Sequence, residues 1–339
     1  MSAVVESEVV SGHWDEQFET GVRSSWFSYP AVLSELNRRV TGRDAFWLSW
    51  VLQEYLTERL ERVLSIGCGD GAHELMMARH NFVGSVDAFD LSPAGIEKAE
   101  QEARADGLNA HFRVRDFDDF IANPGGNYDA VFFIGSLHHV KDLEGMLAAA
   151  RKSLRRDGYL IISEYVGPCY NIYPDDRITI INDTLELLEP IFKTRPDARW
   201  TNPTIETVYS IDPSESVRSE LIPPFLKFYF EPELIRPMGG ALMHPLADHL
   251  NSAKLNDGSA ESKTIVRMLI QMESQLEAAG KLPSDFMVGI YRNTKLPPLP
   301  SATLNAPGEA VEIDCPVTGA EAAEGDHASV VAAHADRIR

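Results

Sequence analysis

A glycine-rich segment, VLSIGCGDG at 63–71, joins a short apolar run to a helical pattern. Gly67 and Gly69 let the backbone pass close to a ligand, and the first turn of the following helix offers it free N–H groups. With Ala72 they satisfy the dinucleotide pattern GxGxx(G/A), and Asp90 follows about 20 residues later, where an acid would grip a ribose. The segment predicts a nucleotide-containing cofactor, and a nicotinamide-dependent oxidoreductase is one candidate class.

Two later segments carry side chains suited to such a cofactor and to its reaction. Asp116 and Phe117 follow an apolar run and place a carboxylate and an aromatic ring where an adenine edge and face would lie. The segment GSLHH at 135–139 brings His138 and His139 to the end of the next apolar run. A histidine at the carboxyl end of a strand can act as a general base near neutral pH, or it can pack beside the cofactor. Both interpretations stay open for the pair.

A third segment, EYVGP at 164–168, ends another apolar run with Glu164 and Tyr165. Because the carboxyl ends of parallel strands meet at one edge of a sheet, Glu164 is expected near His138 and His139. Its carboxylate could accept a proton from an acceptor O–H, N–H or activated C–H, or orient a polar substrate. Capping a helix or pairing with an arginine is the alternative.

The residue pattern between 62 and 164 predicts a scaffold that would bring these segments together. Short apolar runs alternate there with helical patterns, and Ser92-Pro93 marks a helix N-cap followed by proline at the first helical position. Continuous apolar strands separated by helices indicate a parallel, doubly wound α/β sheet buried on both faces. The expected strands are 63–66, 86–89, 111–114, 130–134 and 159–163, and the expected helices are 72–79, 93–106 and 142–154.

The flanking regions have a different character. The N-terminal region is rich in aromatic residues at helical spacing, Trp26 among them, and predicts a helical cap that packs on the sheet or covers a substrate. After Glu164 the alternation stops, and closing strands are expected only at 225–230 and 286–291. The helices expected in this region are 179–192, one opened by Asp212, 239–253 and 259–279.

From 296 onward the composition turns to prolines and then to an acidic, alanine-rich tail without aromatic residues. Such a tail cannot bury enough apolar surface to order itself. The expected division is a helical N-terminal cap at 1–58, a cofactor-binding core at 59–168, a helical substrate-facing insertion with the closing strands at 169–295, and a disordered acidic tail at 296–339.

The composition excludes several classes of protein. A net charge of -20 leaves no basic surplus to neutralise nucleic-acid phosphates. Cys68, Cys169 and Cys315 form neither a disulfide framework nor a thiolate zinc pattern, so a reducing cytoplasm fits. The first residues lack the layout of a signal peptide, and no apolar run approaches the roughly 20 residues of a membrane span. We expect a cytoplasmic protein that binds neither nucleic acid nor membrane, with the oligomeric state open, a homodimer included.

Taken together, these segments resemble the class I (Rossmann-like) S-adenosylmethionine-dependent methyltransferase family. The glycine loop, the acids after the second and third strands, the YD-strand-LHH segment at 128–139 and the DGYLII segment at 157–162 stand in the family's order. The resemblance implies a doubly wound, mostly parallel seven-stranded sheet and S-adenosyl-L-methionine as the cofactor. One position departs from the pattern, because the family often has an acid two residues before the first glycine and this chain has Ser65.

The resemblance also assigns one set of residues to the cofactor. The glycine loop would lie beside its methionine portion, the acid after the second strand would take the ribose hydroxyls, and the acid after the third would accept from the adenine amino group. The residues assigned in this way are Gly67, Cys68, Gly69, Asp90, Leu91, Asp116, Phe117, Gly135 and Ser136.

Beyond the core, the segments EYVGP at 164–168 and DPSESVRS at 212–219 resemble a bacterial small-molecule subgroup of these enzymes. Arg218 would bind a carboxylate or phosphate on the acceptor, or else form a surface ion pair. His244, Glu215 and His249 match no established ligand spacing, so no metal is expected. The residues predicted to contact the substrate are Trp26, Tyr165, Arg218 and His244.

The expected reaction is transfer of a methyl group to a small acceptor, in the biosynthesis of a natural product or of a sugar-containing metabolite. Aligning the acceptor, the methyl group and the sulfur would be the protein's main task, and Glu164, His138 and His139 are the candidate catalytic residues. An NAD(P)-dependent oxidoreductase and a non-catalytic cofactor-binding protein are the alternatives.

Overall fold

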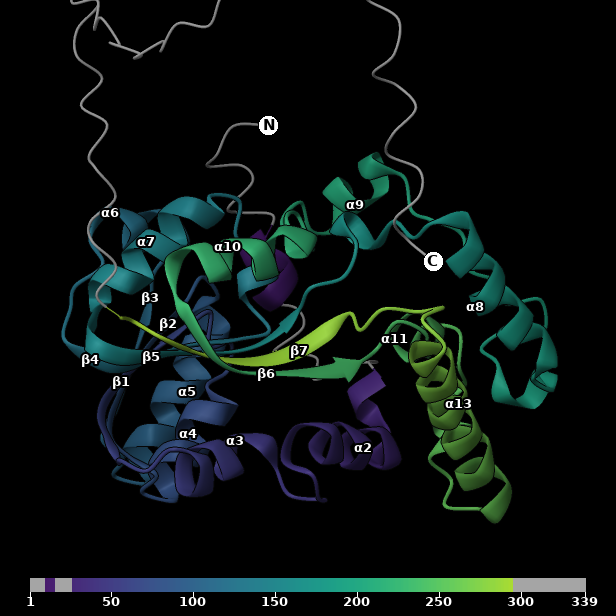
Figure 1. Ribbon diagram of the computed structural model, residues 1–339, viewed down its shortest axis with the longest axis horizontal. Helices are drawn as coiled ribbons and strands as arrows, with labels where there is room; N and C mark the ends of the chain where they lie inside the picture. Colours follow the sequence, from purple (N-terminus) through teal and green to yellow (C-terminus); the bar gives the residue numbers. More distant parts are fainter. Residues whose placement is uncertain (1–9, 16–25, 295–339) are drawn as a thin grey trace, which may run out of the picture. The chain divides into compact units, whose positions relative to one another are not determined.

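Seven strands form one sheet at the centre of the structure, a computed structural model that describes residues 10–15 and 26–294. The strands follow the order β3-β2-β1-β4-β5-β7-β6. Neighbours are parallel from β3 through β5, and β7 is antiparallel to β5 and β6. The predicted mostly parallel seven-stranded sheet of class I methyltransferase type is confirmed (Figure 1). The strands are β1 (Leu60–Ile66), β2 (Val83–Asp90), β3 (Ala110–Val114), β4 (Tyr128–Ile134), β5 (Leu154–Tyr165), β6 (Glu231–Gly239) and β7 (Phe286–Arg292).

Alternating side chains of the central strands fill two separate cores. In β4, Ala130 and Phe132 belong to one core, whereas Val131 and Phe133 belong to the other. All four are fully buried because helices cover both faces, as the continuous apolar runs predicted. The first face carries α2 (Pro30–Thr41), α3 (Trp47–Trp50), α4 (Ala72–Arg79) and α5 (Pro93–Ala105), and the second carries α6 (Phe117–Ala122), α7 (Leu143–Ser153) and α10 (Ile222–Tyr229).

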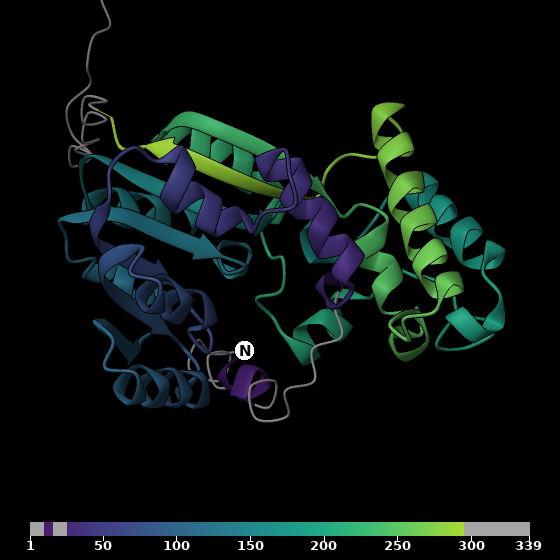
Figure 2. The same cartoon turned by 90° about the horizontal axis from the view of Figure 1, so that it is seen from below.

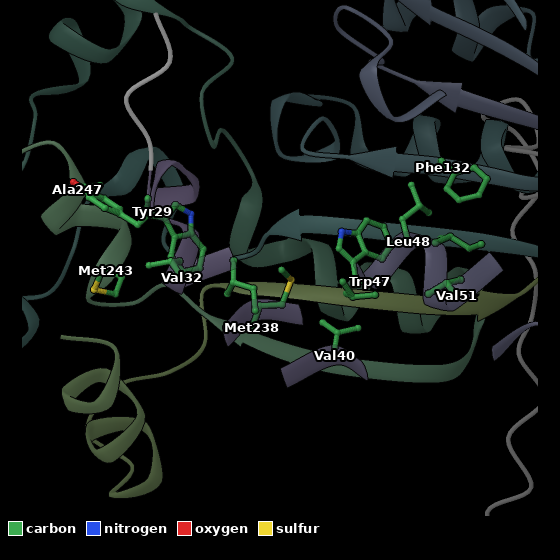
Figure 3. Packing of buried hydrophobic residues seen from close by; sticks show 14 of the residues in the cluster. Tyr29, Val32, Val40, Trp47, Leu48, Val51, Phe132, Met238, Met243 and Ala247 are labelled. Atoms are coloured by element: carbon green, nitrogen blue, oxygen red, sulfur yellow. The ribbon is translucent and has the colours of Figure 1, made fainter. Parts of the chain in front are cut away.

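The N-terminal helices extend the first core along the sheet. Val40 of α2 and Met238 of β6 are buried in one cluster, and Trp47 and Leu48 of α3 continue it toward Phe132 of β4 (Figure 3). Of the described part of the predicted N-terminal cap, α2 and α3 therefore pack directly on the sheet.

Further helices lie beyond the ends of β6 and β7. The two longest, α8 (Asp175–Leu187) and α13 (Ala260–Ala278), lie side by side (Figure 2). They touch where the Thr184 hydroxyl oxygen approaches the Met272 sulfur at 3.6 Å. The remaining helices of the insertion are α9 (Ile205–Ile211), α11 (Met243–Ala247) and α12 (Ser252–Leu255).

The predicted strand at 225–230 is wrong, because residues 225–229 belong to α10 and strand β6 begins only at Glu231. Proline is tolerated in the first turn of a helix, and both prolines of α10 stand there. Ile222 and Leu226, four residues apart, are then fully buried against the second core. Strand β6 escaped prediction because Pro232 and Pro237 interrupt its pattern, and an edge strand tolerates proline.

Two helix predictions in the insertion are also wrong. Residues 213–218 form turns. The Asp212 carboxylate accepts hydrogen bonds from the backbone N–H and the hydroxyl of Ser214, at 2.8 and 2.6 Å, and so closes a tight turn. The segment 239–253 holds only the short helices α11 and α12. The predicted disordered tail lies outside the described residues. In the part of the chain that the structure describes, no helix is long and apolar enough to cross a membrane.

Candidate active site

One cavity collects nearly all of the predicted site residues where β1, β2, β4 and β5 end. Its volume is ≈ 1500 Å³, above the roughly 300–1,000 Å³ of most small-molecule sites. It therefore has room for a nucleotide cofactor and a second molecule. Two predicted residues, Glu164 and Arg218, are not part of its lining. The predicted residues that line it are Trp26, Gly67, Cys68, Gly69, Asp90, Leu91, Asp116, Phe117, Gly135, Ser136, His138, His139, Tyr165 and His244.

The turn after β1 adopts a backbone conformation that glycine accepts without strain. Gly67 and Gly69 have φ angles of 70° and 58°. A Cβ atom on Gly67 would lie 2.5 Å from the Cβ of Ser136, so the loops after β1 and β4 meet here with no space for a side chain. The Gly67 N–H also donates to the Phe89 carbonyl of β2 at 2.9 Å. The ends of β1, β2 and β4 thus together form one wall of the cavity.

Two acidic residues of this wall take part in its backbone hydrogen bonds. Asp90 accepts from the Gly69 N–H at 2.8 Å and from the Ser92 N–H at 2.9 Å. Asp116 caps α6 by accepting from the Asp119 N–H at 2.7 Å. Both also line the cavity, so their carboxylates are held in place before a ligand binds.

A buried carboxylate that the motifs do not reveal lies beneath the glycine loop. Glu74, in the first turn of α4, is 1% exposed, and its Oε1 accepts from the Ser65 hydroxyl at 2.5 Å. Its Oε2 has no hydrogen-bond partner among the described residues. Burial raises the pKa of Glu74 to about 7. The family that this chain resembles often has an acid at the strand position that Ser65 occupies here. Helix α4 instead brings the Glu74 carboxylate to this position, and Ser65 is the only sequence signal for it.

We expect Glu74→Gln to change how stability depends on pH. Because the folded-state pKa lies above the ordinary 4.5, folding favours the protonated carboxyl, and the free energy of unfolding falls as pH rises from 4.5 through about 7. A shift of this size amounts to about 3 kcal/mol. When thermal unfolding of the cofactor-free protein is followed, the wild type should lose more stability between about pH 5 and pH 8 than Glu74→Gln does. Equal losses in the two proteins would contradict this account of Glu74.

Glu164 connects the ends of β4 and β5. It is 1% exposed, and its Oε1 accepts from the backbone N–H groups of Ser136 and Leu137, each at 2.8 Å. Its Oε2 lies 2.7 Å from Nδ1 of His138. The predicted proximity of Glu164 to the histidines is therefore present, but its carboxylate is enclosed by the β4 turn. It can act on a substrate only through His138, and we describe it as a positioning residue.

His139 is held by the insertion. Its Nδ1 lies 3.0 Å from the Ser214 hydroxyl and 3.5 Å from Oδ2 of Asp212. Glu215, from the same turns, lines the cavity and places Oε2 4.0 Å from Nε2 of His139. These three insertion residues complete the site. They stand in the segment DPSESVRS at 212–219, where only Glu215 was considered as a ligand.

Three of the histidines that line the cavity, His138, His139 and His244, differ in their electrostatic surroundings. Burial opposes protonation of His138, but the hydrogen bond and charge of Glu164 outweigh it and raise the pKa of His138. Burial and the neighbouring His138 lower the pKa of His139. Burial also lowers the pKa of His244 to about 4. Near neutral pH, His139 and His244 are therefore neutral and can accept a hydrogen bond or bind a cation.

The predicted substrate residues fall into two groups. Trp26, Tyr165 and His244 surround Phe286, with ring centroids 4.8 to 5.2 Å from it, and form an aromatic wall of the cavity. Arg218 lies elsewhere and binds Glu144 with Nη2 2.9 Å from Oε1. Of the two roles considered for Arg218, the ion pair is the one present in the structure.

Comparison with known proteins finds similarity in the segment that holds the glycine loop. Residues 63–158 match a family described as "Methyltransferase domain". The ubiquinone biosynthesis O-methyltransferase of Xanthomonas axonopodis pv. citri (strain 306) is 34% identical over 120 residues, which cover 34% of this chain and 49% of that protein. The protein of the same name from Xylella fastidiosa (strain 9a5c) is 29% identical over 145 residues, covering 38% and 58%. The chain thus spans about half the length of the curated relatives it matches.

A solved structure with a similar chain path is geranyl diphosphate C-methyltransferase from Streptomyces coelicolor A3(2). It is 16% identical, with a TM-score of 0.47, and the match covers 87% of this chain and 100% of that one. Residues 63–158, which include the glycine loop, are thus similar to a methyltransferase domain. S-adenosylmethionine is the cofactor of this family.

Proposed function

We propose that this chain is an S-adenosylmethionine-dependent methyltransferase that methylates a small molecule. The observation that carries the proposal is the continuity of the cavity from the glycine loop to His138 and His139. One end has the acids and close backbone approach that suit the cofactor, and the other has room and polar groups for an acceptor. Gly135 and Ser136 line the cavity where the two ends meet, so the methyl group would be presented there.

Bound S-adenosylmethionine supplies a methyl group that the sulfonium charge makes electrophilic. The chain's own residues bind and align the partners. Asp90 would accept from ribose hydroxyls and Asp116 from an adenine amino group, while the backbone of the glycine loop would lie beside the methionine portion. The aromatic wall around Phe286 would pack against an apolar part of the acceptor. Alignment in this site would supply most of the rate enhancement.

The acceptor side favours a molecule with an oxygen nucleophile. His138, His139 and Glu215 present polar atoms to the cavity next to an aromatic wall, which suits a hydroxylated, partly apolar compound. The matched relatives are named as O-methyltransferases. We place the acceptor among natural products or sugar-containing metabolites. We further propose a cytoplasmic location, which the unpaired Cys68 and Cys169 fit.

Transfer of label from methyl-labelled S-adenosylmethionine tests this function. The purified full chain is incubated with a panel of hydroxylated aromatic compounds and sugars, and the products are separated from the cofactor. We expect label in at least one organic product together with an equal amount of S-adenosylhomocysteine. Oxidation or reduction of the panel with NAD(P)(H), and no methyl transfer, would instead support the oxidoreductase alternative.

A further inference from the structure

Three side chains with metal-binding atoms converge at the acceptor end of the cavity. Ligand atoms of His138, His139 and Glu215 all lie within 4.8 Å of one another. Nε2 of His139 and Oε2 of Glu215 are 4.0 Å apart, beyond hydrogen-bond distance. Two atoms bound to one tetrahedral zinc ion at about 2.1 Å lie roughly 3.4 Å apart. The three side chains would therefore have to approach one another by roughly 1 Å to share a cation.

Hydrogen bonds on the far side of each ring decide which nitrogen faces the cluster. The Glu164 carboxylate can only accept, so His138 donates from Nδ1 across 2.7 Å. Ser214 donates its single hydroxyl proton to Asp212 at 2.6 Å, so its oxygen accepts from Nδ1 of His139 at 3.0 Å. In their neutral forms, both rings therefore carry the proton on Nδ1 and leave the lone pair on Nε2.

Glu215 is oriented by hydrogen bonds in the same manner. Its Oε1 accepts from the Ser216 hydroxyl at 2.5 Å and from the Asn171 side-chain amide at 3.3 Å. Its Oε2 lies on the side of His139. Two imidazole lone pairs and a carboxylate oxygen thus share one small space, an arrangement that a positive charge at its centre would stabilise. Polar partners that orient ligating histidines from behind are the usual outer shell of a metal site.

We propose that His138, His139 and Glu215 bind a divalent transition-metal cation, of the class of Zn²⁺ or Fe²⁺. Two imidazoles and one carboxylate are a donor set for these ions and leave at least one coordination position open. All three residues line the cavity, so the open position faces the acceptor. The proposal departs from the expectation of no metal, which considered Glu215 with His244 and His249 and not with the two adjacent histidines.

The role of the cation rests on the proposed function. An acceptor hydroxyl that coordinates through its oxygen has a lowered pKa and releases its proton to solvent. The oxygen then forms a bond to the methyl carbon as the carbon–sulfur bond of the sulfonium breaks, and S-adenosylhomocysteine leaves. Glu164 and Asp212 would hold the ligands in place throughout.

Metal binding to the purified full chain tests the site without an acceptor. After dialysis against a chelator, Zn²⁺ is titrated in competition with a chromophoric chelator, and the visible absorption of added Co²⁺ reports the ligand set. We expect one tightly bound Zn²⁺ per chain. Affinity should fall by more than about 100-fold in His139→Ala and Glu215→Gln, and by about 10- to 100-fold in Glu164→Gln, which only orients His138. The matched control His111→Ala removes an exposed histidine of β3 and should bind as the wild type does.

Equal affinity in the wild type and in all of these variants, or no binding at all, would overturn the metal site. S-adenosylhomocysteine affinity, measured on the same preparations, shows whether each variant is folded and separates this proposal from the function on which it rests. A chain that binds S-adenosylhomocysteine but no metal would keep the proposed function, with His138, His139 and Glu215 accepting hydrogen bonds from the substrate directly. A chain that binds metal but no S-adenosylhomocysteine would keep the site and refute the function.

Discussion

Replacing Glu164 with glutamine should lower turnover by about 100-fold or more while leaving cofactor affinity unchanged. The reason is the tautomer of His138. Oε1 of Glu164 accepts from two backbone N–H groups, and only the oxygen of the glutamine amide can replace it there. The amide nitrogen must then face Nδ1 of His138 and donate to it, so the ring proton moves to Nε2. The lone pair that faces the cavity is lost, and a wrong tautomer of this kind is very costly in other enzymes.

Two measurements check this expectation once an acceptor is known. Values of kcat and KM are determined separately for Glu164→Gln and for Glu144→Gln, a control that removes a carboxylate outside the cavity. ¹⁵N NMR of the histidine rings reports the tautomer directly. A loss confined to KM would mean that Glu164 serves acceptor binding alone. If Glu164→Gln kept the wild-type kcat and KM and the His138 tautomer did not change, Glu164 would have no part in the reaction.

Replacing Asp90 with alanine should weaken S-adenosylmethionine binding by about 1–3 kcal/mol, or roughly 5- to 150-fold. Buried ribose hydroxyls would lose a charged acceptor, and the Gly69 N–H would lose the partner that fixes the glycine loop at 2.8 Å. Asp90→Asn should lose less, because an amide oxygen can still accept from Gly69. Titration calorimetry on both variants gives the affinities. If Asp90→Ala bound the cofactor like the wild type, the ribose would have to lie elsewhere in the cavity.

That the residues assigned to the cofactor gather in one cavity could be predicted from the sequence because their signals are local. Each cofactor residue stands within a few positions of a strand end, and the apolar runs that mark those strands are continuous. The turn glycines Gly67 and Gly69 need positive φ angles, which is a property of the residue type. Parallel strands then bring their carboxyl ends to one edge without further information.

The acceptor side could not be predicted in the same way because it depends on distant packing. Glu215 reaches His139 from a turn that an Asp212 hydrogen bond creates, where a proline and an acid are equally typical of a helix start. The pairing of Glu74 with Ser65 crosses the glycine loop, and Arg218 meets Glu144 across 74 positions of the chain. None of these contacts leaves a periodic pattern.

Calorimetric titration of the purified full chain with S-adenosylhomocysteine tests the central claim most directly, with NADH titrated in parallel. The account predicts saturable binding of one S-adenosylhomocysteine per chain, competition with S-adenosylmethionine, and no binding of NADH under the same conditions. Saturable binding of NADH with no heat from S-adenosylhomocysteine would contradict it. The glycine loop and Asp90 would then serve a dinucleotide, and the chain would belong with the oxidoreductases.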